Sequence, residues 1–287
     1  MTVERLAVIG AGTMGRGIIE VAATHGVTVR AYDINDDVCA KAAAALRTSI
    51  ERGIKRGKVS GGSADPYMQR VTFSCDLAET VRDAQFVIEA IPEIQELKLK
   101  TIGELDRLAP AGVVLASNTS SLSITKLAAA TGRPERVVGM HFFNPVPVMA
   151  PVEIVRAEQT SEATMTETLE FGRQLGKEAF AVADVPGFAV NRILMPLINE
   201  AVFALQEGVA DARTIDSLMK LGCNHPMGPL ELADFVGLDV CLWILQVLHR
   251  ELGDPKFRPC PLLARKVDAK HLGRKTGRGF YEYPRKE

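Results

Sequence analysis

Two apolar runs in the middle of the chain end in polar residues whose chemistry suits proton transfer. Val113–Ser117 leads into a loop that contains Ser120, and Arg136–Met140 leads directly to His141. An imidazole, with an ordinary pKa of about 6.5, can accept the proton of a hydroxyl group while hydride leaves the adjacent carbon. His141 is therefore the candidate base, and Ser120 is a candidate hydrogen-bond partner of the same substrate oxygen.

Glu153 is the candidate orienting group for this base, because a carboxylate commonly binds the second ring nitrogen of such a histidine. It lies twelve residues after His141 and is the single acid in the apolar run Pro151–Val155. Each residue also has an ordinary structural interpretation: a core histidine, the solvent face of a strand and, for Ser120, a helix cap. Taken together at strand ends, where loops carry function, they favour a site for oxidation or reduction.

A glycine-rich segment near the N-terminus predicts a dinucleotide site. Gly10-Ala-Gly12-Thr-Met-Gly15 follows the apolar run Leu6–Ile9 and opens a helical pattern. The first glycine permits a tight turn, the second lets the backbone approach a pyrophosphate, and the third lets helix and strand pack closely. The helix N-terminus presents free N–H groups to the phosphates. The predicted contacts are Gly10, Gly12, Thr13, Met14 and Gly15.

Asp33, at the end of the second predicted strand, predicts which dinucleotide is bound. It lies 18 residues after Gly15, where an acid would accept a hydrogen bond from the adenosine ribose 2′-hydroxyl. A carboxylate repels a 2′-phosphate, so NAD is favoured over NADP. The alternative is a glycine turn that binds nothing, with Asp33 as a helix cap. The fingerprint alone does not define a reaction, since flavoproteins and redox sensors share it.

The surrounding pattern predicts an α/β Rossmann-type dinucleotide-binding domain with a mostly parallel sheet, followed by an all-α C-terminal domain. The predicted strands are Leu6–Ile9, Thr28–Asp33, Val71–Ser74, Phe86–Ala90, Val113–Ser117, Val137–His141, Val152–Val155 and Ala179–Ala183. Predicted helices between them are Met14–His25, Asp36–Arg52, Glu96–Leu108 and Ser123–Ala129. After Pro186-Gly187 the helical period takes over in Ala189–Glu207, Ala212–Leu221 and Val236–Leu252. The predicted domains are 1–186 and 187–287.

The composition of the chain argues against several classes of protein. The 287 residues include 34 basic and 35 acidic side chains, a net charge of −1 that argues against a nucleic-acid binder. Five widely spaced cysteines without a C-x-x-C motif predict neither a metal site nor a disulfide framework, and fit a reducing compartment. The first apolar run lacks a basic leader, and Arg16 and Glu20 interrupt the next, so we expect a cytoplasmic protein without a membrane span.

Longer motifs carry a resemblance over nearly the whole chain. They are GAGTMG at 10–15, SNTSSLSIT at 117–125, GMHFFNPVPVM at 139–149, PGFAVNRIL at 186–194, NHPMGPLELAD at 224–234, GLDV at 237–240 and GRKTGRGFYEY at 273–283. The sequence resembles the 3-hydroxyacyl-CoA dehydrogenases, and most closely those of the short-chain, single-function 3-hydroxybutyryl-CoA dehydrogenase type. The middle and C-terminal motifs are far more specific than a glycine loop.

The resemblance implies a role for each matching residue. His141 would be the general base paired with Glu153, while Ser120 and Asn191 would hydrogen-bond the reacting oxygen. Asn191 has helix capping as its alternative interpretation. The residues implied near the cofactor are Glu93, Lys98, Asn118 and Asn144, the last also close to the substrate. Lys55 and Lys58 match the neighbourhood of the acyl-CoA phosphates, although a charge run is usually a solvated helix end.

The implied reaction is NAD-dependent interconversion of an (S)-3-hydroxyacyl-CoA and a 3-ketoacyl-CoA, with an acyl-CoA substrate and a homodimer formed through the helical domain. The alternatives are a sugar-acid or free β-hydroxy-acid dehydrogenase on the same fold, or a non-catalytic dinucleotide-binding protein.

Two departures from the family pattern bear on acyl-chain preference and cofactor affinity. Ala150-Pro151 replaces a usual Lys-Leu, and Arg16 and Glu20 replace small or neutral residues at a spacing that suits an i,i+4 ion pair.

Overall fold

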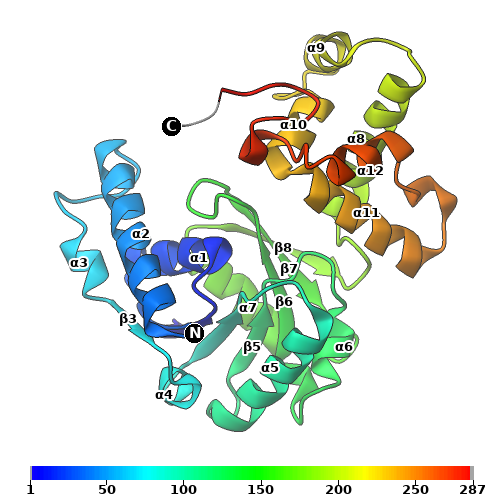
Figure 1. Cartoon of the computed structure of the whole chain (residues 1–287). Coiled ribbons are helices and arrows are strands. Elements are labelled where there is room, and N and C mark those ends of the chain that lie inside the picture. Colours follow the sequence, from blue (N-terminus) through cyan, green and yellow to red (C-terminus); the bar gives the residue numbers. More distant parts are fainter. Residues whose placement is uncertain (1, 285–287) are drawn as a thin grey trace. The chain divides into compact units, whose positions relative to one another are not determined.

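Short apolar strands separated by amphipathic helices build one eight-stranded sheet in the computed structural model, which describes residues 2–284 (Figure 1). The strands are β1 (Arg5–Ile9), β2 (Thr28–Tyr32), β3 (Val71–Ser74), β4 (Phe86–Glu89), β5 (Val114–Ser117), β6 (Val137–Phe142), β7 (Pro151–Arg156) and β8 (Glu178–Ala183). Their order in the sheet is β3-β2-β1-β4-β5-β6-β7-β8. Each pair from β3 through β6 is parallel, and β6 and β7 are antiparallel. The prediction of a Rossmann-type, mostly parallel sheet is confirmed.

Helices cover this sheet and supply its core. They are α1 (Thr13–Thr24), α2 (Asp36–Lys55), α3 (Asp65–Met68), α4 (Leu77–Val81), α5 (Gln95–Leu108), α6 (Ile124–Ala128) and α7 (Glu162–Gln174). Apolar side chains of α1, α2 and α7 pack with those of the strands in one buried cluster. Asn35 caps α2, because its side-chain oxygen accepts a hydrogen bond from the Val38 backbone N–H. These contacts hold α1 and α2 beside each other at one end of the sheet.

The sheet order places a switch point at β1, whose neighbours β2 and β4 are reached by connections on opposite sides. Gly10 follows β1 with a φ of 99°, and a Cβ there would lie 2.8 Å from the Ala90 carbonyl oxygen. A Cβ on Gly15 would lie 1.8 Å from the Gly10 carbonyl oxygen. The turn and the close packing of α1 therefore exclude a side chain at both positions.

A second compact unit begins at Pro186 and consists of helices, drawn in yellow-green to red in Figure 1. They are α8 (Val190–Gln206), α9 (Ala212–Gly222), α10 (Pro229–Val236), α11 (Leu238–Leu252) and α12 (Pro261–Asp268). The single helix predicted over Val236–Leu252 is wrong at its start. Val236 belongs to α10, and Gly237 separates it from α11 with a φ of 106° that other residues rarely adopt.

Two buried carboxylates attach the C-terminal segment to these helices. Asp234 accepts hydrogen bonds from the backbone N–H groups of Phe280 and Tyr281, and Asp216 accepts one from the Tyr281 hydroxyl at 2.7 Å. Between residues 2 and 284, no single helix is long and apolar enough to cross a membrane. Helices α10 and α11 reach that length and composition only as a pair, and they are bent by 97°.

Candidate active site

His141 and Glu153 form a buried pair across β6 and β7. The antiparallel register sets them directly opposite each other, so both side chains leave the same face of the sheet. Nδ1 of His141 lies 2.7 Å from Oε2 of Glu153, and the two residues are 6% and 3% exposed. The His141 ring also packs against the Phe143 ring, with centroids 4.7 Å apart. The pair has the geometry of a base oriented by a carboxylate.

Ser120 is held by Glu93 at the adjoining strand ends. One oxygen of Glu93, Oε1, accepts hydrogen bonds from the Ser120 backbone N–H at 2.8 Å, the Ser120 hydroxyl at 3.2 Å and the Thr119 hydroxyl at 2.5 Å. Its other oxygen lies 3.4 Å from Nζ of Lys98. Glu93 therefore fixes the loop after β5 and links it to the loop after β4.

Lys98 is almost fully buried behind Glu93, at 1% exposure. Its ammonium donates to Oε1 of Glu89 at 2.6 Å and to the Ile91 carbonyl oxygen at 3.2 Å. The second oxygen of Glu89 accepts from the Ser117 hydroxyl at 2.6 Å. Two carboxylates and one ammonium thus form a connected network with hydrogen bonds on every member, as burial of charge requires. Lys98 thus contacts the carboxylates of both Glu89 and Glu93.

The three predicted asparagines lie on different elements. Asn118, 9% exposed, accepts a hydrogen bond from the Phe142 backbone N–H at 2.9 Å and so ties the end of β5 to the end of β6. Asn144 is exposed in the loop that joins β6 to β7. Asn191, 8% exposed, belongs to α8 of the second unit.

The glycine loop has the features of a phosphate cradle. Gly12 is the N-cap of α1 and provides no side-chain hydrogen bond, so the first N–H groups of the helix remain available. A Cβ on Gly12 would meet nothing within 4 Å, which marks open space beside the backbone. Asp33 accepts hydrogen bonds from the N–H groups of Ala11 and Ile34 at 2.7 and 2.8 Å, which fix its carboxylate beside the loop. These residues fit an NAD pyrophosphate and ribose.

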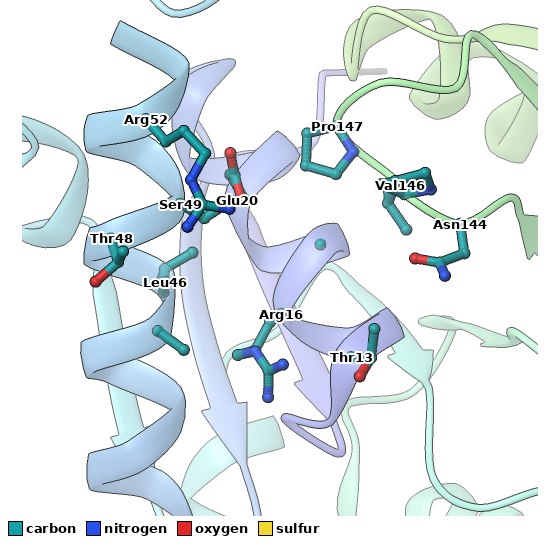
Figure 2. Close-up of a pocket in the computed structure, with 13 residues that line it drawn as sticks. Thr13, Arg16, Glu20, Leu46, Thr48, Ser49, Arg52, Asn144, Val146 and Pro147 are labelled. Carbon is teal, nitrogen blue, oxygen red and sulfur yellow. The ribbon is translucent and has the colours of Figure 1, made fainter. Parts of the chain in front are cut away.

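A cavity of about 380 Å³ opens between α1, α2 and the loop at 144–147 (Figure 2). Its lining residues are Thr13, Arg16, Gly17, Glu20, Ala45, Leu46, Thr48, Ser49, Arg52, Asn144, Pro145, Val146 and Pro147. In Figure 2 the Arg52 side chain extends from α2 across Ser49 toward Glu20 of α1. The cavity is thus bordered by two guanidinium groups and one carboxylate.

Glu20 is only 4% exposed although it borders this cavity. Burial raises the pKa of its carboxyl group, and the hydrogen bond from Ser49 and the charge of Arg52 partly oppose that rise. Arg16 donates to the Ala11 carbonyl oxygen at 3.4 Å. The expected Arg16–Glu20 pair is therefore replaced by contacts to other residues: Glu20 bonds across to α2, and Arg16 bonds back to the glycine loop.

The family models settle the relationship of this chain to known proteins. Residues 5–185 match the model described as 3-hydroxyacyl-CoA dehydrogenase, NAD binding domain, and residues 187–283 match its C-terminal domain. The chain belongs to the 3-hydroxyacyl-CoA dehydrogenase family. It is an NAD-dependent dehydrogenase, which confirms the predicted family, enzyme class and cofactor.

Similar members of the 3-hydroxyacyl-CoA dehydrogenase family match over their full length. A probable 3-hydroxybutyryl-CoA dehydrogenase of Bacillus subtilis is 49% identical, with 100% of this chain and 99% of that protein covered. A 3-hydroxybutyryl-CoA dehydrogenase of Bradyrhizobium diazoefficiens is 47% identical, with 98% and 96% covered. The crystal structure of the (S)-3-hydroxybutyryl-CoA dehydrogenase PaaH1 from Ralstonia eutropha is 46% identical, with a TM-score of 0.94 and coverage of 99% and 100%.

The predicted substrate-binding lysines lie outside the cavity of this dehydrogenase, and three residues at or near the site were not predicted. Lys55 and Lys58 are exposed at and beyond the last turn of α2 and do not line the cavity. Sequence reasoning missed Ser49 and Arg52, whose three-residue spacing on α2 marks one helix face. It also missed Glu89, an acid that ends a buried strand. Between residues 2 and 284, no group of three or more His, Cys, Asp or Glu side chains could hold a metal ion.

Proposed function

We propose that this dehydrogenase interconverts (S)-3-hydroxybutyryl-CoA and acetoacetyl-CoA, with His141 and Glu153 as its acid–base pair. The observation that carries the proposal is the buried 2.7 Å contact between these two side chains. The choice of substrate is supported by the names of the relatives from Bacillus subtilis, Bradyrhizobium diazoefficiens and Ralstonia eutropha.

In the oxidative direction, Nε2 of His141 accepts the proton of the substrate 3-hydroxyl group. Glu153 occupies Nδ1, so it fixes the ring and stabilises the imidazolium that forms. Bound NAD supplies the hydride acceptor for carbon 3. In reduction His141 returns the proton to the carbonyl oxygen along the same path.

Ser120 and Asn191 hold the substrate oxygen while its charge develops, the role of preorganised hydrogen-bond donors in such sites. Glu93 supports this function because it accepts from both the backbone and the hydroxyl of Ser120. Lys98 in turn holds Glu93 through its charge. We thus assign Lys98 to positioning, because Glu93 and Ser120 lie between it and the substrate oxygen.

The cofactor is proposed to lie along the edge from the glycine loop to the acid–base pair. Gly10, Gly12, Thr13, Met14 and Gly15 border the pyrophosphate, and Asp33 binds the adenosine ribose. Glu93, Asn118 and Asn144 lie toward the nicotinamide end. Support comes from the uncapped N-terminus of α1 and from the fixed carboxylate of Asp33.

The cavity between α1 and α2 is proposed to take part of the acyl-CoA chain. Arg16 and Arg52 border it, and the exposed Lys55 and Lys58 continue the positive charge at the end of α2 and just beyond it. The helical unit, residues 187–287, is proposed to be a substrate-binding and dimerisation domain. Its exposed apolar side chains support this second role; they include Ile193, Val209, Leu218, Leu221 and Phe235. The cytoplasmic location stays a prediction.

Initial rates of acetoacetyl-CoA reduction, followed through the nicotinamide absorbance, test the proposed function. We expect NADH-dependent turnover and little with NADPH, and we expect His141→Gln to abolish most of that turnover. Turnover with free β-hydroxy acids and none with acyl-CoA would overturn the substrate assignment. Full activity of His141→Gln would overturn the mechanism, and elution as a monomer in size-exclusion chromatography with light scattering would overturn the dimer.

A further inference from the structure

Two cysteines approach each other at the edge of the sheet, outside the proposed acid–base machinery. Cys39 is 6% exposed in α2, and Cys75 is exposed in the bend that follows β3. Their Sγ atoms are 3.9 Å apart although 36 positions separate them in the chain. The Cys39 thiol also points at the Ser74 carbonyl oxygen, 3.9 Å away. The thiols therefore face one another directly.

The arrangement requires only a small movement for a bond to form. A disulfide has an S–S distance of about 2.05 Å, so the two sulfurs must approach by about 2 Å. Cys75 lies in an exposed bend, whereas Cys39 is held in helix α2. A reagent in solution can reach Cys75, and Cys39 lies directly behind it to complete the exchange.

We propose that Cys39 and Cys75 form a reversible disulfide when a small-molecule disulfide, such as oxidised glutathione, oxidises the chain. The Cys75 thiolate attacks the reagent, so a mixed disulfide forms and one glutathione thiol leaves. The Cys39 thiolate then attacks Sγ of Cys75, and the second glutathione thiol leaves. Two protein thiols lose two electrons and two protons, and the reagent gains both to give two thiols.

Asp36, in the first turn of α2, controls the rate of this exchange. The Cys75 thiol donates to Oδ1 of Asp36 at 3.3 Å. Desolvation and the hydrogen bonds with Asp36 and Cys39 raise the pKa of the Cys75 thiol to about 12, and the nearby Tyr32 phenol has a raised pKa as well. Few thiolates are then present near neutral pH, so the reduced pair persists until the oxidant is abundant. Asp36→Asn removes the negative charge and accelerates the reaction.

The disulfide would act on the cofactor through Asp33, an inference that rests on the proposed function of Asp33 as the ribose ligand. The Ser74 carbonyl oxygen accepts a hydrogen bond from the Asp33 backbone N–H at 3.3 Å, and Cys75 is the next residue. A bond to Cys39 draws this bend toward α2 and disturbs the segment that carries Asp33. We expect the KM for NADH to rise at least about fivefold, while the KM for acetoacetyl-CoA stays constant.

The test treats the full chain with oxidised glutathione and identifies linked peptides by mass spectrometry. The expected product is a Cys39–Cys75 peptide that dithiothreitol reverses. Cys223, exposed and at a distance in sequence, is the matched control and should carry only a glutathione adduct. Cys39→Ser should leave glutathione on Cys75, and Cys75→Ser should leave Cys39 unmodified, both with normal activity before oxidation.

Three outcomes would overturn parts of the proposal. Persistent glutathione on Cys75 of the unmutated chain, with no linked peptide, would overturn the disulfide. An oxidation rate that is unchanged in Asp36→Asn would overturn the role of Asp36. A linked chain with an unchanged KM for NADH would overturn the effect on the cofactor. The mass readout requires no dehydrogenase activity, so failure of the proposed function would be recognised separately.

Discussion

Replacement of Glu153 by glutamine tests the proposed acid–base pair most directly. Glutamine keeps the shape of the side chain and a hydrogen-bonding oxygen opposite His141, but it removes the negative charge. The buried position of both residues excludes water that could replace that charge. The imidazolium formed during oxidation would therefore lose its counter-charge, while the fold would keep its packing.

The size of the effect follows from the separation of the charges. With Nδ1 and Oε2 only 2.7 Å apart, the centres of the imidazolium and carboxylate charges are about 4 Å apart, where the attraction is about 4 kcal/mol at an effective dielectric constant of about 20. Because each 1.4 kcal/mol changes a rate about tenfold, kcat should fall about 10³-fold. The KM for NADH should change little, because Glu153 acts on His141.

Steady-state oxidation of (S)-3-hydroxybutyryl-CoA by NAD measures kcat, and acetoacetyl-CoA reduction with NADH gives the KM for NADH. Glu167→Gln is the matched control, since it makes the same chemical change at an ion pair with Arg136 in the same unit, and it should alter kcat by less than about twofold. Circular dichroism and thermal unfolding verify that both variants are folded. A folded Glu153→Gln enzyme with kcat within about threefold of the unmutated chain would refute the proposed role of Glu153.

Three further predictions concern the cofactor, stability and pH. Asp33→Asn should lower kcat/KM for NADH about tenfold. It should also reduce the discrimination against NADPH, because it removes the charge that repels a 2′-phosphate. An unchanged cofactor preference would contradict this assignment. Lys98→Met should cost about 3 kcal/mol of unfolding free energy in urea titrations, because Glu89 stays buried without its cation. Arg47→Met, at an exposed ion pair, is the control and should cost far less. Glu20→Gln should stabilise the chain at pH 7, because folding raises the pKa of Glu20 and so makes ionisation of its carboxyl group unfavourable above that pKa. Thermal unfolding should show this stabilisation disappear as the pH falls below 4.5, the ordinary pKa of the carboxyl group. A stabilisation that grows in acid would contradict the prediction.

The sheet was predictable because its strands are short apolar runs with clear punctuation between them. Helices were harder where the pattern is mixed. The first half of α7 carries five threonine and glutamate residues, Glu162 and those of the run TMTET, and its apolar face is marked mainly by Met165 and Phe171. The boundary between α10 and α11 depends on one glycine, Gly237, inside a continuous apolar pattern.

Some parts of the site are specified by the local sequence, whereas others depend on how distant segments pack together. The glycine loop is a local feature, since its turn and the following helix are specified within a few residues. Ser49 and Arg52 become a cavity wall only because α2 packs beside α1, and no pattern within α2 predicts what its neighbour provides. The burial of Lys98 also depends on Glu89 and Glu93, which approach it from outside its helix.

Because β6 and β7 pair in antiparallel register, the geometry of the His141–Glu153 pair does not depend on the loop that lines the cavity. His141 and Glu153 face each other because of strand pairing, whereas the loop at 143–150 joins the two strands and contributes Asn144, Pro145, Val146 and Pro147 to the cavity. An insertion or deletion in the loop leaves the paired strands in step, while a single-residue slip in β7 turns Glu153 to the opposite face. The cavity lining can therefore change during evolution while the His141–Glu153 pair keeps its geometry.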